Sequence, residues 1–287
     1  MSCACMQSVD LFVHSNLFYL LVFMVGACVG SFSCVCITRI PKGESIIFPR
    51  SHCVCGKIIP AWLNIPIISW LILRAKARCC GAGISVGYFA IEVLVAVLFT
   101  ILWHVTQSAL FVVGSILFVI LVIALGIDFD RMMIPDSLTV GGTMVGIIVS
   151  GLLPWFVSSG GVFCGVLESV KGLLIGSSLL LWIAIISEFI LKKETIGFGD
   201  VKLMGCIGAF SGTNCAIFSI FGGAVIGLVT LFPIWAIHCK LNNKPLGMGC
   251  QLPFGPFLAL GAISYWLFFK EAVDSSFSEM MMLLSQV

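Results

Sequence analysis

Long apolar stretches recur along most of this chain, and they restrict its fold more than any other feature. Several approach or exceed the roughly 20 residues with which an α-helix crosses a bilayer. Of the 287 residues, 60% are hydrophobic and only 10% are charged. The mean hydropathy of +1.17 lies well outside the range of soluble domains. The sequence therefore predicts an all-α, polytopic integral membrane protein.

We expect about eight transmembrane helices and one sizeable cytoplasmic loop. The expected spans are residues 17–38, 86–105, 108–127, 138–157, 167–191, 203–213, 216–238 and 254–270. The sixth stretch is too short to cross a bilayer alone, so it predicts a half-helix that its neighbours bury. The chain then divides into the N-terminus with the first helix (1–38), the loop (39–85) and a helical bundle (86–287) that carries the candidate site.

The orientation in the membrane follows from the distribution of Lys and Arg. Residues 39–85 hold seven of the fifteen basic residues and a single acidic one, Glu44. Because cytoplasmic loops carry an excess of Lys and Arg, this loop is expected on the cytoplasmic side. Alternating the spans from there brings Asp128 and Asp200 to the cytoplasmic edge of the membrane.

These two aspartates stand at the ends of strongly apolar stretches. Asp128 ends the run Ala124-Leu125-Gly126-Ile127, and Asp200 follows Gly197-Phe198-Gly199. A carboxylate at membrane depth is costly unless it is paired or used, so each is a candidate functional residue. Two carboxyls about 3 Å apart share a proton, which lets one take a proton from water while the other polarises a carbonyl. The pair predicts the chemistry of an aspartic peptidase.

Residues beside the aspartates have both functional and structural interpretations. Gly197 and Gly199 lack side chains that would block a substrate backbone. Lys202 is placed to bias the charge of Asp200 or to meet phospholipid, and the sequence does not separate the two. Asp136 either supports the site or caps the helix that it precedes. A lone interfacial aspartate is ordinarily a solvated helix end, so the inference depends on the two aspartates together.

Several short motifs resemble those of the type IV prepilin leader peptidases, which are bacterial inner-membrane aspartic peptidases of the Gly-x-Gly-Asp type. The resemblance covers most of the chain, from about residue 26 to 262, and the order and spacing of the motifs make it specific. The motifs are Gly30-Ser31-Phe32, Arg39-Ile40-Pro41, Asn64-Ile65-Pro66, Ser69-Trp70-Leu71, Leu73-Arg74, Ile84-Ser85, Tyr88 with Glu92, Ile127-Asp128, Pro135-Asp136, Gly197-Phe198-Gly199-Asp200-Val201-Lys202-Leu203 and Pro253-Phe254-Gly255-Pro256-Phe257-Leu258.

This resemblance implies an enzyme whose catalytic pair is Asp128 and Asp200. The implied substrates are prepilins and type II secretion pseudopilins, cut after a glycine that ends a short basic leader at the cytoplasmic face of the bacterial inner membrane. It also implies N-methylation of the new N-terminal residue with S-adenosylmethionine, an activity associated with the 39–85 loop. The expected partners are these substrates and the lipid bilayer, with no nucleic acid.

The cysteines of the loop depart from the family pattern of two Cys-x-x-Cys pairs, a spacing that suits tetrahedral zinc. The ligands that remain for a zinc site are Cys53, Cys55, Cys79 and Cys80, with His52 as the alternative to Cys53. Adjacent cysteines must turn the chain sharply to serve one ion, so we expect at most one of Cys79 and Cys80 to ligate. The competing interpretation is reduced free thiols in a cytosolic loop, where structural disulfides are rare.

Two intramembrane features predict helix packing. Gly26-x-x-x-Gly30 is typical of a face on which two helices approach closely. Glu92 lies within an expected span, so we expect it to face the bundle, hydrogen-bonded or protonated.

Three other classes of protein compete with the peptidase. A polytopic transporter also buries acidic residues, but it places them near mid-membrane and shows repeat symmetry. A secretion-assembly scaffold is compatible with the composition but has no need of the aspartate pair. A membrane zinc protease requires a His-Glu-x-x-His helix, and none of the four histidines is so arranged.

Overall fold

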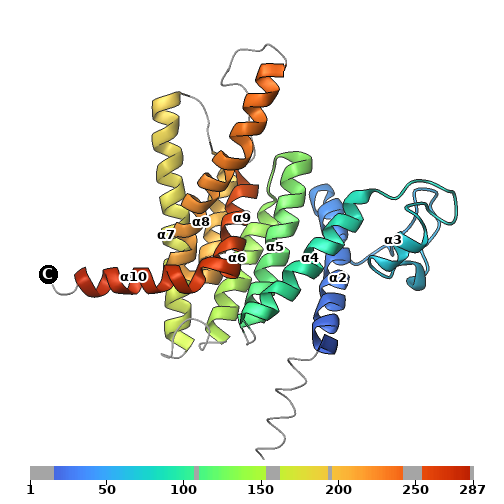
Figure 1. Cartoon of the computed structure of the whole chain (residues 1–287), viewed down its shortest axis with the longest axis horizontal. Helices are drawn as coiled ribbons and strands as arrows, with labels where there is room; N and C mark the ends of the chain where they lie inside the picture. The colour runs from blue at the N-terminus through green and yellow to red at the C-terminus, as the bar shows by residue number, and fades with distance from the viewer. Residues whose placement is uncertain (1–15, 107–109, 153–161, 193–195, 242–253, 285–287) are drawn as a thin grey trace, which may run out of the picture. The chain divides into compact units, whose positions relative to one another are not determined.

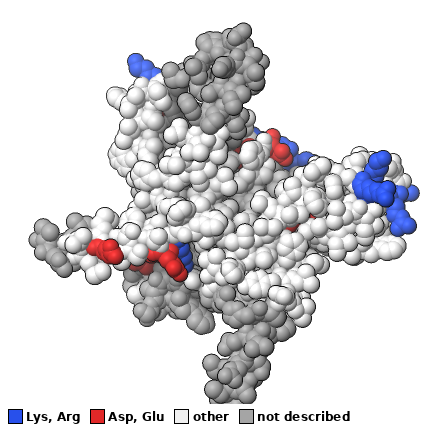
Figure 2. All heavy atoms as spheres, in the orientation of Figure 1, with Lys and Arg blue, Asp and Glu red and all other residues white. Residues whose placement is uncertain are grey.

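The computed structural model describes residues 16–106, 110–152, 162–192, 196–241 and 254–284 (Figure 1). Within these ranges the structure consists of helices and turns, with two isolated β-bridges in the 39–85 loop. The chain forms two compact units, Met1–Phe111 and Val112–Val287. Figure 2 shows that most of the visible surface carries no charge and that Lys and Arg gather over the 39–85 loop.

The first unit pairs two long apolar helices, α2 (Asn16–Arg39) and α4 (Val86–Thr106). A Cβ added to Gly26 would lie 2.8 Å from the Cα of Ala96, and one added to Gly30 would lie 2.8 Å from the Cα of Glu92. Only glycine allows backbones to approach this closely. The predicted close-packing face of α2 is therefore confirmed.

Between α2 and α4, the 39–85 loop contains only short helical elements. They are η1 (Ile40–Lys42), η2 (Ala61–Leu63) and α3 (Ile68–Ile72). The loop is held to α4 at Glu92, whose Oε2 accepts a hydrogen bond of 2.7 Å from the backbone N–H of Ile67. Trp70 also stacks on Phe89 of α4, with ring centroids 4.6 Å apart. Glu92 is thus buried and hydrogen-bonded, as the sequence predicts.

The second unit is a bundle of helices that continues to the end of the described chain. It comprises α5 (Leu110–Arg131, apart from its first two residues), α6 (Asp136–Leu152), α7 (Val162–Leu191), α8 (Phe198–Leu241), α9 (Gly255–Ser264), the π-helical segment η4 (Tyr265–Phe269) and α10 (Lys270–Leu284). Buried hydroxyls join three of these helices, since Ser150 of α6 and Ser169 of α7 both donate to the carbonyl of Ala209 in α8, at 3.3 and 2.7 Å.

Helix α8 reverses its direction at Gly212. A Cβ added to Gly176 of α7 would lie 3.0 Å from both the carbonyl oxygen of Met204 and the Cβ of Ala216. These two residues would be about 18 Å apart along a straight helix, so the chain must fold back between them. The reversal uses a backbone of φ 75° and ψ −174° at Gly212, which glycine adopts without the strain of a side chain.

The expected count of about eight spans is not confirmed. In the described part of the chain, five helices are long and apolar enough to cross a membrane, and α6 is a shorter apolar helix. The predicted sixth and seventh spans are the two arms of α8, so the half-helix was located correctly. The predicted eighth span is divided between α9 and η4.

Candidate active site and thiol cluster

Asp128 and Asp200 converge on Gly255, although the three residues are far apart in the sequence. The last turn of α5 carries Asp128 and the first turn of α8 carries Asp200, and both are buried, with 5% and 8% of their surface exposed. A Cβ added to Gly255 would lie 2.9 Å from Oδ2 of Asp128 and 3.0 Å from Oδ1 of Asp200. The two oxygens are therefore at most about 6 Å apart, a range in which like charges oppose joint ionisation.

The two carboxyls have different surroundings. Asp200 accepts hydrogen bonds from the backbone N–H groups of Gly197 and Gly255, which are free to donate because they lie at the starts of α8 and α9. Oδ2 of Asp128 is buried and has no hydrogen-bond partner among the described residues. A buried carboxylate oxygen without a donor is costly, so this oxygen is suited to bind a group that enters the site.

Gly255 is a further candidate site residue, which the sequence analysis quoted within a motif but did not assign to the site. Its backbone donates to Asp200, and its missing side chain leaves room for both carboxyls and for Ile134. Gly197 and Gly199 are less crowded: an added Cβ would lie 3.8 Å from Asp200 Oδ2 and 3.4 Å from Ile134 Cβ, respectively. The available signal was Pro253-Phe254-Gly255-Pro256, a glycine beside a proline at the first turn of a helix.

Within the protein, the side chain of Lys202 pairs with Asp136 rather than with Asp200. Its Nζ lies 2.6 Å from Oδ1 of Asp136 and 5.0 Å from the centre of the Phe198 ring. Asp136 is the first residue of α6, and the carbonyl of Pro135 accepts the N–H groups of that first turn. The ion pair of Asp136 with Lys202 joins the starts of α6 and α8.

Four cysteines of the 39–85 loop lie on two short turns. In the first, a bridge between His52 and Ile58 closes a turn that carries Cys53 and Cys55; in the second, Lys76 and Gly83 close a turn that carries Cys79 and Cys80. Gly56 and Gly81 have φ of 81° and 70°, which let each turn tighten around its cysteines.

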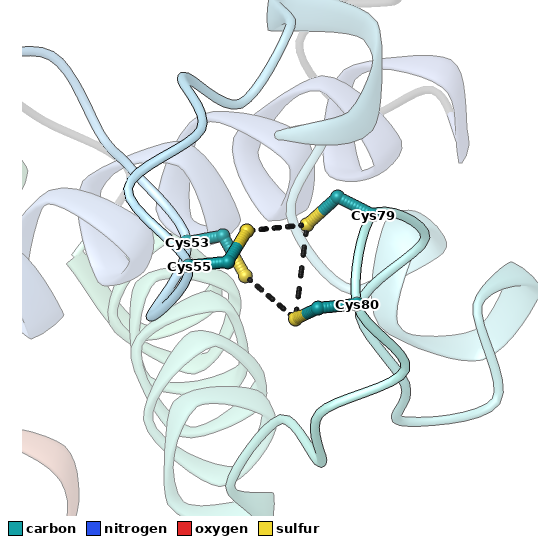
Figure 3. Close-up of side chains that lie close together, drawn as sticks. All are labelled: Cys53, Cys55, Cys79 and Cys80. Atoms are coloured by element: carbon teal, nitrogen blue, oxygen red, sulfur yellow. Dashed lines mark hydrogen bonds between the residues drawn. The ribbon is translucent and has the colours of Figure 1, made fainter.

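The four thiols of these turns point toward one another (Figure 3). The sulfurs of Cys53 and Cys80 are 3.5 Å apart and those of Cys55 and Cys79 are 3.3 Å apart, and all four lie within 4.8 Å of each other. A tetrahedral zinc with bonds of about 2.3 Å needs sulfurs about 3.8 Å apart, so the four thiols fit this ion. The turn at Gly81 aims the sulfurs of both Cys79 and Cys80 inward, so the geometry does not impose the expected limit of one ligand from this pair.

His52 is not a member of this cluster. Its Nδ1 lies 3.2 Å from the carbonyl of Arg50 instead. A backbone hydrogen bond from Cys55, followed by thiol hydrogen bonds from Cys79 and Cys80, lowers the pKa of Cys53 to about 7. Hydrogen bonds with the thiols of Cys53 and then Cys55 raise the pKa of Cys79 to about 12. Cys53 is therefore the first of these two thiols to become the anionic ligand that a metal needs.

Comparison with known proteins identifies the family of this chain. Residues 24–106 match the bacterial peptidase A24 N-terminal domain, and residues 115–232 match the type IV leader peptidase family. The Neisseria gonorrhoeae protein named prepilin leader peptidase/N-methyltransferase is 32% identical over 286 residues, which cover 91% of this chain and 93% of that protein. The chain belongs to the type IV leader peptidase family.

Two other relatives with the same name match over a smaller share of this chain. The Dichelobacter nodosus protein is 34% identical over 80% of this chain and 74% of its own length. The Myxococcus xanthus protein is 33% identical over 75% of this chain, but the match spans only 64% of that longer relative. No solved structure matches this chain.

The two matched regions of the chain contain different candidate site residues. The N-terminal match contains the four cysteines and Glu92, and the second match contains Asp128 and Asp200. Gly255 lies beyond residue 232, where the second match ends.

Proposed function

We propose that this chain removes the leader peptides of prepilins and type II secretion pseudopilins, with Asp128 and Asp200 as the catalytic pair. The observation that carries the proposal is the convergence of both carboxyls on Gly255. A transporter or a scaffold would not require two buried carboxyls within about 6 Å of one another, because such a pair is costly unless it shares a proton. The relatives' name supports the same activity.

The geometry supports hydrolysis by a water molecule held between the two carboxyls. One carboxylate takes a proton from the water as its oxygen attacks the carbonyl carbon after the leader glycine, and the protonated partner donates a hydrogen bond to the carbonyl oxygen. The tetrahedral intermediate then breaks at the C–N bond, and the leaving amine receives a proton from the pair. A pair that shares one proton titrates as a unit, so the roles of base and acid belong to the pair.

Cleavage takes place at the cytoplasmic edge of the bacterial inner membrane in this proposal. The excess of Lys and Arg in residues 39–85 supports that orientation. Asp128 and Asp200 lie at helix ends rather than in the middle of their helices, so a substrate backbone can reach them from the membrane surface.

The second proposed activity is N-methylation of the N-terminal residue that cleavage exposes. S-adenosylmethionine would supply the methyl group for the free amine, leaving as the neutral thioether while the amine loses a proton. The 39–85 loop presents the rings of Phe48 and Trp62, 72% and 66% exposed, and such faces are suited to stack on adenine. These two residues are our candidates for holding the cofactor.

Zinc is proposed as a structural ion of this loop, held by Cys53, Cys55, Cys79 and Cys80. The loop is too small to bury a core of its own, so a metal that joins its two turns would stabilise it. Four thiolates leave no open coordination position, which is typical of structural rather than catalytic zinc.

The test is cleavage of a prepilin with its glycine–phenylalanine junction by proteoliposomes that contain the wild type, Asp128→Ala or Asp200→Ala. We expect each variant to lose processing while it still inserts at normal levels. Asp130→Ala is the matched control, since Asp130 lies on the same helix end but is exposed, and it should cleave normally. Processing by either variant of the pair would refute the proposed mechanism.

A further inference from the structure

Helix α10 carries its apolar and polar residues on different sides. Its apolar positions recur with the spacing i, i+4, i+7 and i+8, which places them along one stripe of a helix; they are Val273, Phe277, Met280 and Met281. The opposite side is mostly polar and exposed, with Glu271, Ser275, Ser278 and Glu279. Acidic residues are visible along this helix in Figure 2.

This helix begins at a distance from the carboxyl pair that corresponds to most of a bilayer. α9 starts beside the aspartates at Gly255, and α9 with η4 extends to Phe269. At about 1.5 Å per residue these elements are about 20 Å long, compared with about 30 Å for the hydrocarbon layer. Figure 1 shows that α10 then runs across the direction of α7 instead of along it.

A polar cluster ties the start of α10 to the bend of α8. Oδ1 of Asp274 accepts hydrogen bonds from Asn214 Nδ2 at 2.9 Å and from Tyr265 Oη at 2.6 Å. Asn214 follows the bend at Gly212, and Ser211 just before the bend accepts a bond of 2.8 Å from Trp266 Nε1. Tyr and Trp with a polar partner are enriched where a membrane meets water.

The second half of α10 leaves the bundle with its apolar side uncovered. Met280 and Met281 are 47% and 63% exposed. Phe268 and Phe269, on the segment that immediately precedes α10, are also exposed, at 71% and 47%. An apolar stripe that adjoins membrane-spanning helices and lies across them has the geometry of a helix in the membrane surface.

We propose that α10 lies in the bilayer surface on the side opposite the aspartates, with Met280 and Met281 against acyl chains and the acidic side toward water. Lipid is the occupant because α10 runs across the direction of α7 directly after the exposed Phe268 and Phe269, so its stripe adjoins the surface of the membrane-spanning bundle. The proposal does not depend on the peptidase activity.

The test is photo-crosslinking with p-benzoylphenylalanine placed at Met281 or at Ser275, which faces the opposite side of the helix. Each full-length protein is reconstituted in vesicles of phosphatidylethanolamine and phosphatidylglycerol, with acyl chains either deuterated or not, and is irradiated. Mass spectrometry then identifies lipid adducts by the isotope shift. Equal helicity and a single size-exclusion peak for both proteins would show that they fold alike.

We expect at least tenfold more lipid adduct from position 281 than from position 275. Equal yields at the two positions, or no adduct at 281, would overturn the proposal, because the stripe would then not be immersed. A crosslinked dimer of the chain at 281 would also overturn it and would assign the stripe to an interface between copies.

Discussion

Gly255→Ala tests the convergence of the two carboxyls most directly. The added methyl would lie 2.9 Å from Asp128 Oδ2, 3.0 Å from Asp200 Oδ1 and 3.1 Å from Ile134 Cδ1. Each of these contacts is a few tenths of an ångström too short, so both carboxyls must move apart or the start of α9 must withdraw. Overpacking of this kind costs about 1–3 kcal/mol, whereas a displacement of reacting groups approaching 1 Å costs about a hundredfold in rate.

We therefore expect Gly255→Ala to lower kcat for prepilin cleavage about a hundredfold while the protein remains folded. The assay is cleavage in proteoliposomes over a range of substrate concentrations, with Tm and yield measured on the same preparation. Gly141→Ala is the matched control, because a Cβ at Gly141 in α6 would meet nothing within 4 Å, and it should cleave normally. A Gly255→Ala enzyme with wild-type kcat would refute the geometry, since the methyl cannot fit between unmoved carboxyls.

Three other predictions concern the neighbouring groups. Asp136→Asn and Lys202→Met should each slow cleavage only a few-fold, because the side chain of Asp136 is 68% exposed and such an ion pair contributes at most about 1 kcal/mol. A double-mutant cycle that gives no coupling energy between the two residues would contradict a role for the pair. Zinc content, measured by mass spectrometry after dialysis, should fall in Cys79→Ser and also in the wild type as pH is lowered, because protons compete with the metal for the four thiolates. Full retention of zinc by Cys79→Ser would contradict the assignment. Glu92→Ala should speed hydrogen exchange near Ile67, because the backbone N–H of Ile67 loses a 2.7 Å hydrogen bond. Glu92→Gln should not, because the amide oxygen of the glutamine still accepts that bond. Equal exchange rates in the two variants would show that this bond does not hold the loop.

The sequence predicts those parts of the site that depend on composition and on local position. Asp128 and Asp200 could be identified because a carboxyl within an apolar stretch is costly wherever the fold places it. The short span before Gly212 was recognised by its length, and the structure shows that it is one arm of a hairpin. The number of spans was not predictable to the same degree, because apolar stretches do not reveal where a helix bends back.

Residues whose role depends on approach between distant elements could not be assigned from the sequence. Gly255 is such a residue, since its significance lies in two oxygens that arrive from α5 and α8. The partner of Lys202 is another: Asp200 is two residues away in sequence, but the side chain reaches Asp136 instead. The adjacent Cys79 and Cys80 were judged by spacing alone, which does not include the turn that Gly81 permits.

The division of the chain leads to an expectation about its two activities. Asp128, Asp200 and Gly255 all lie in the second compact unit, whereas the four thiols, Phe48 and Trp62 lie in the first. The hydrogen bonds that hold each group come from its own unit, so none of those that hold the carboxyls is lost with the thiol cluster. Cys53→Ser should therefore reduce methylation of the mature N-terminus more than cleavage, as mass spectrometry of the product would show. An equal loss of both would mean that the loop also presents the substrate to the aspartates.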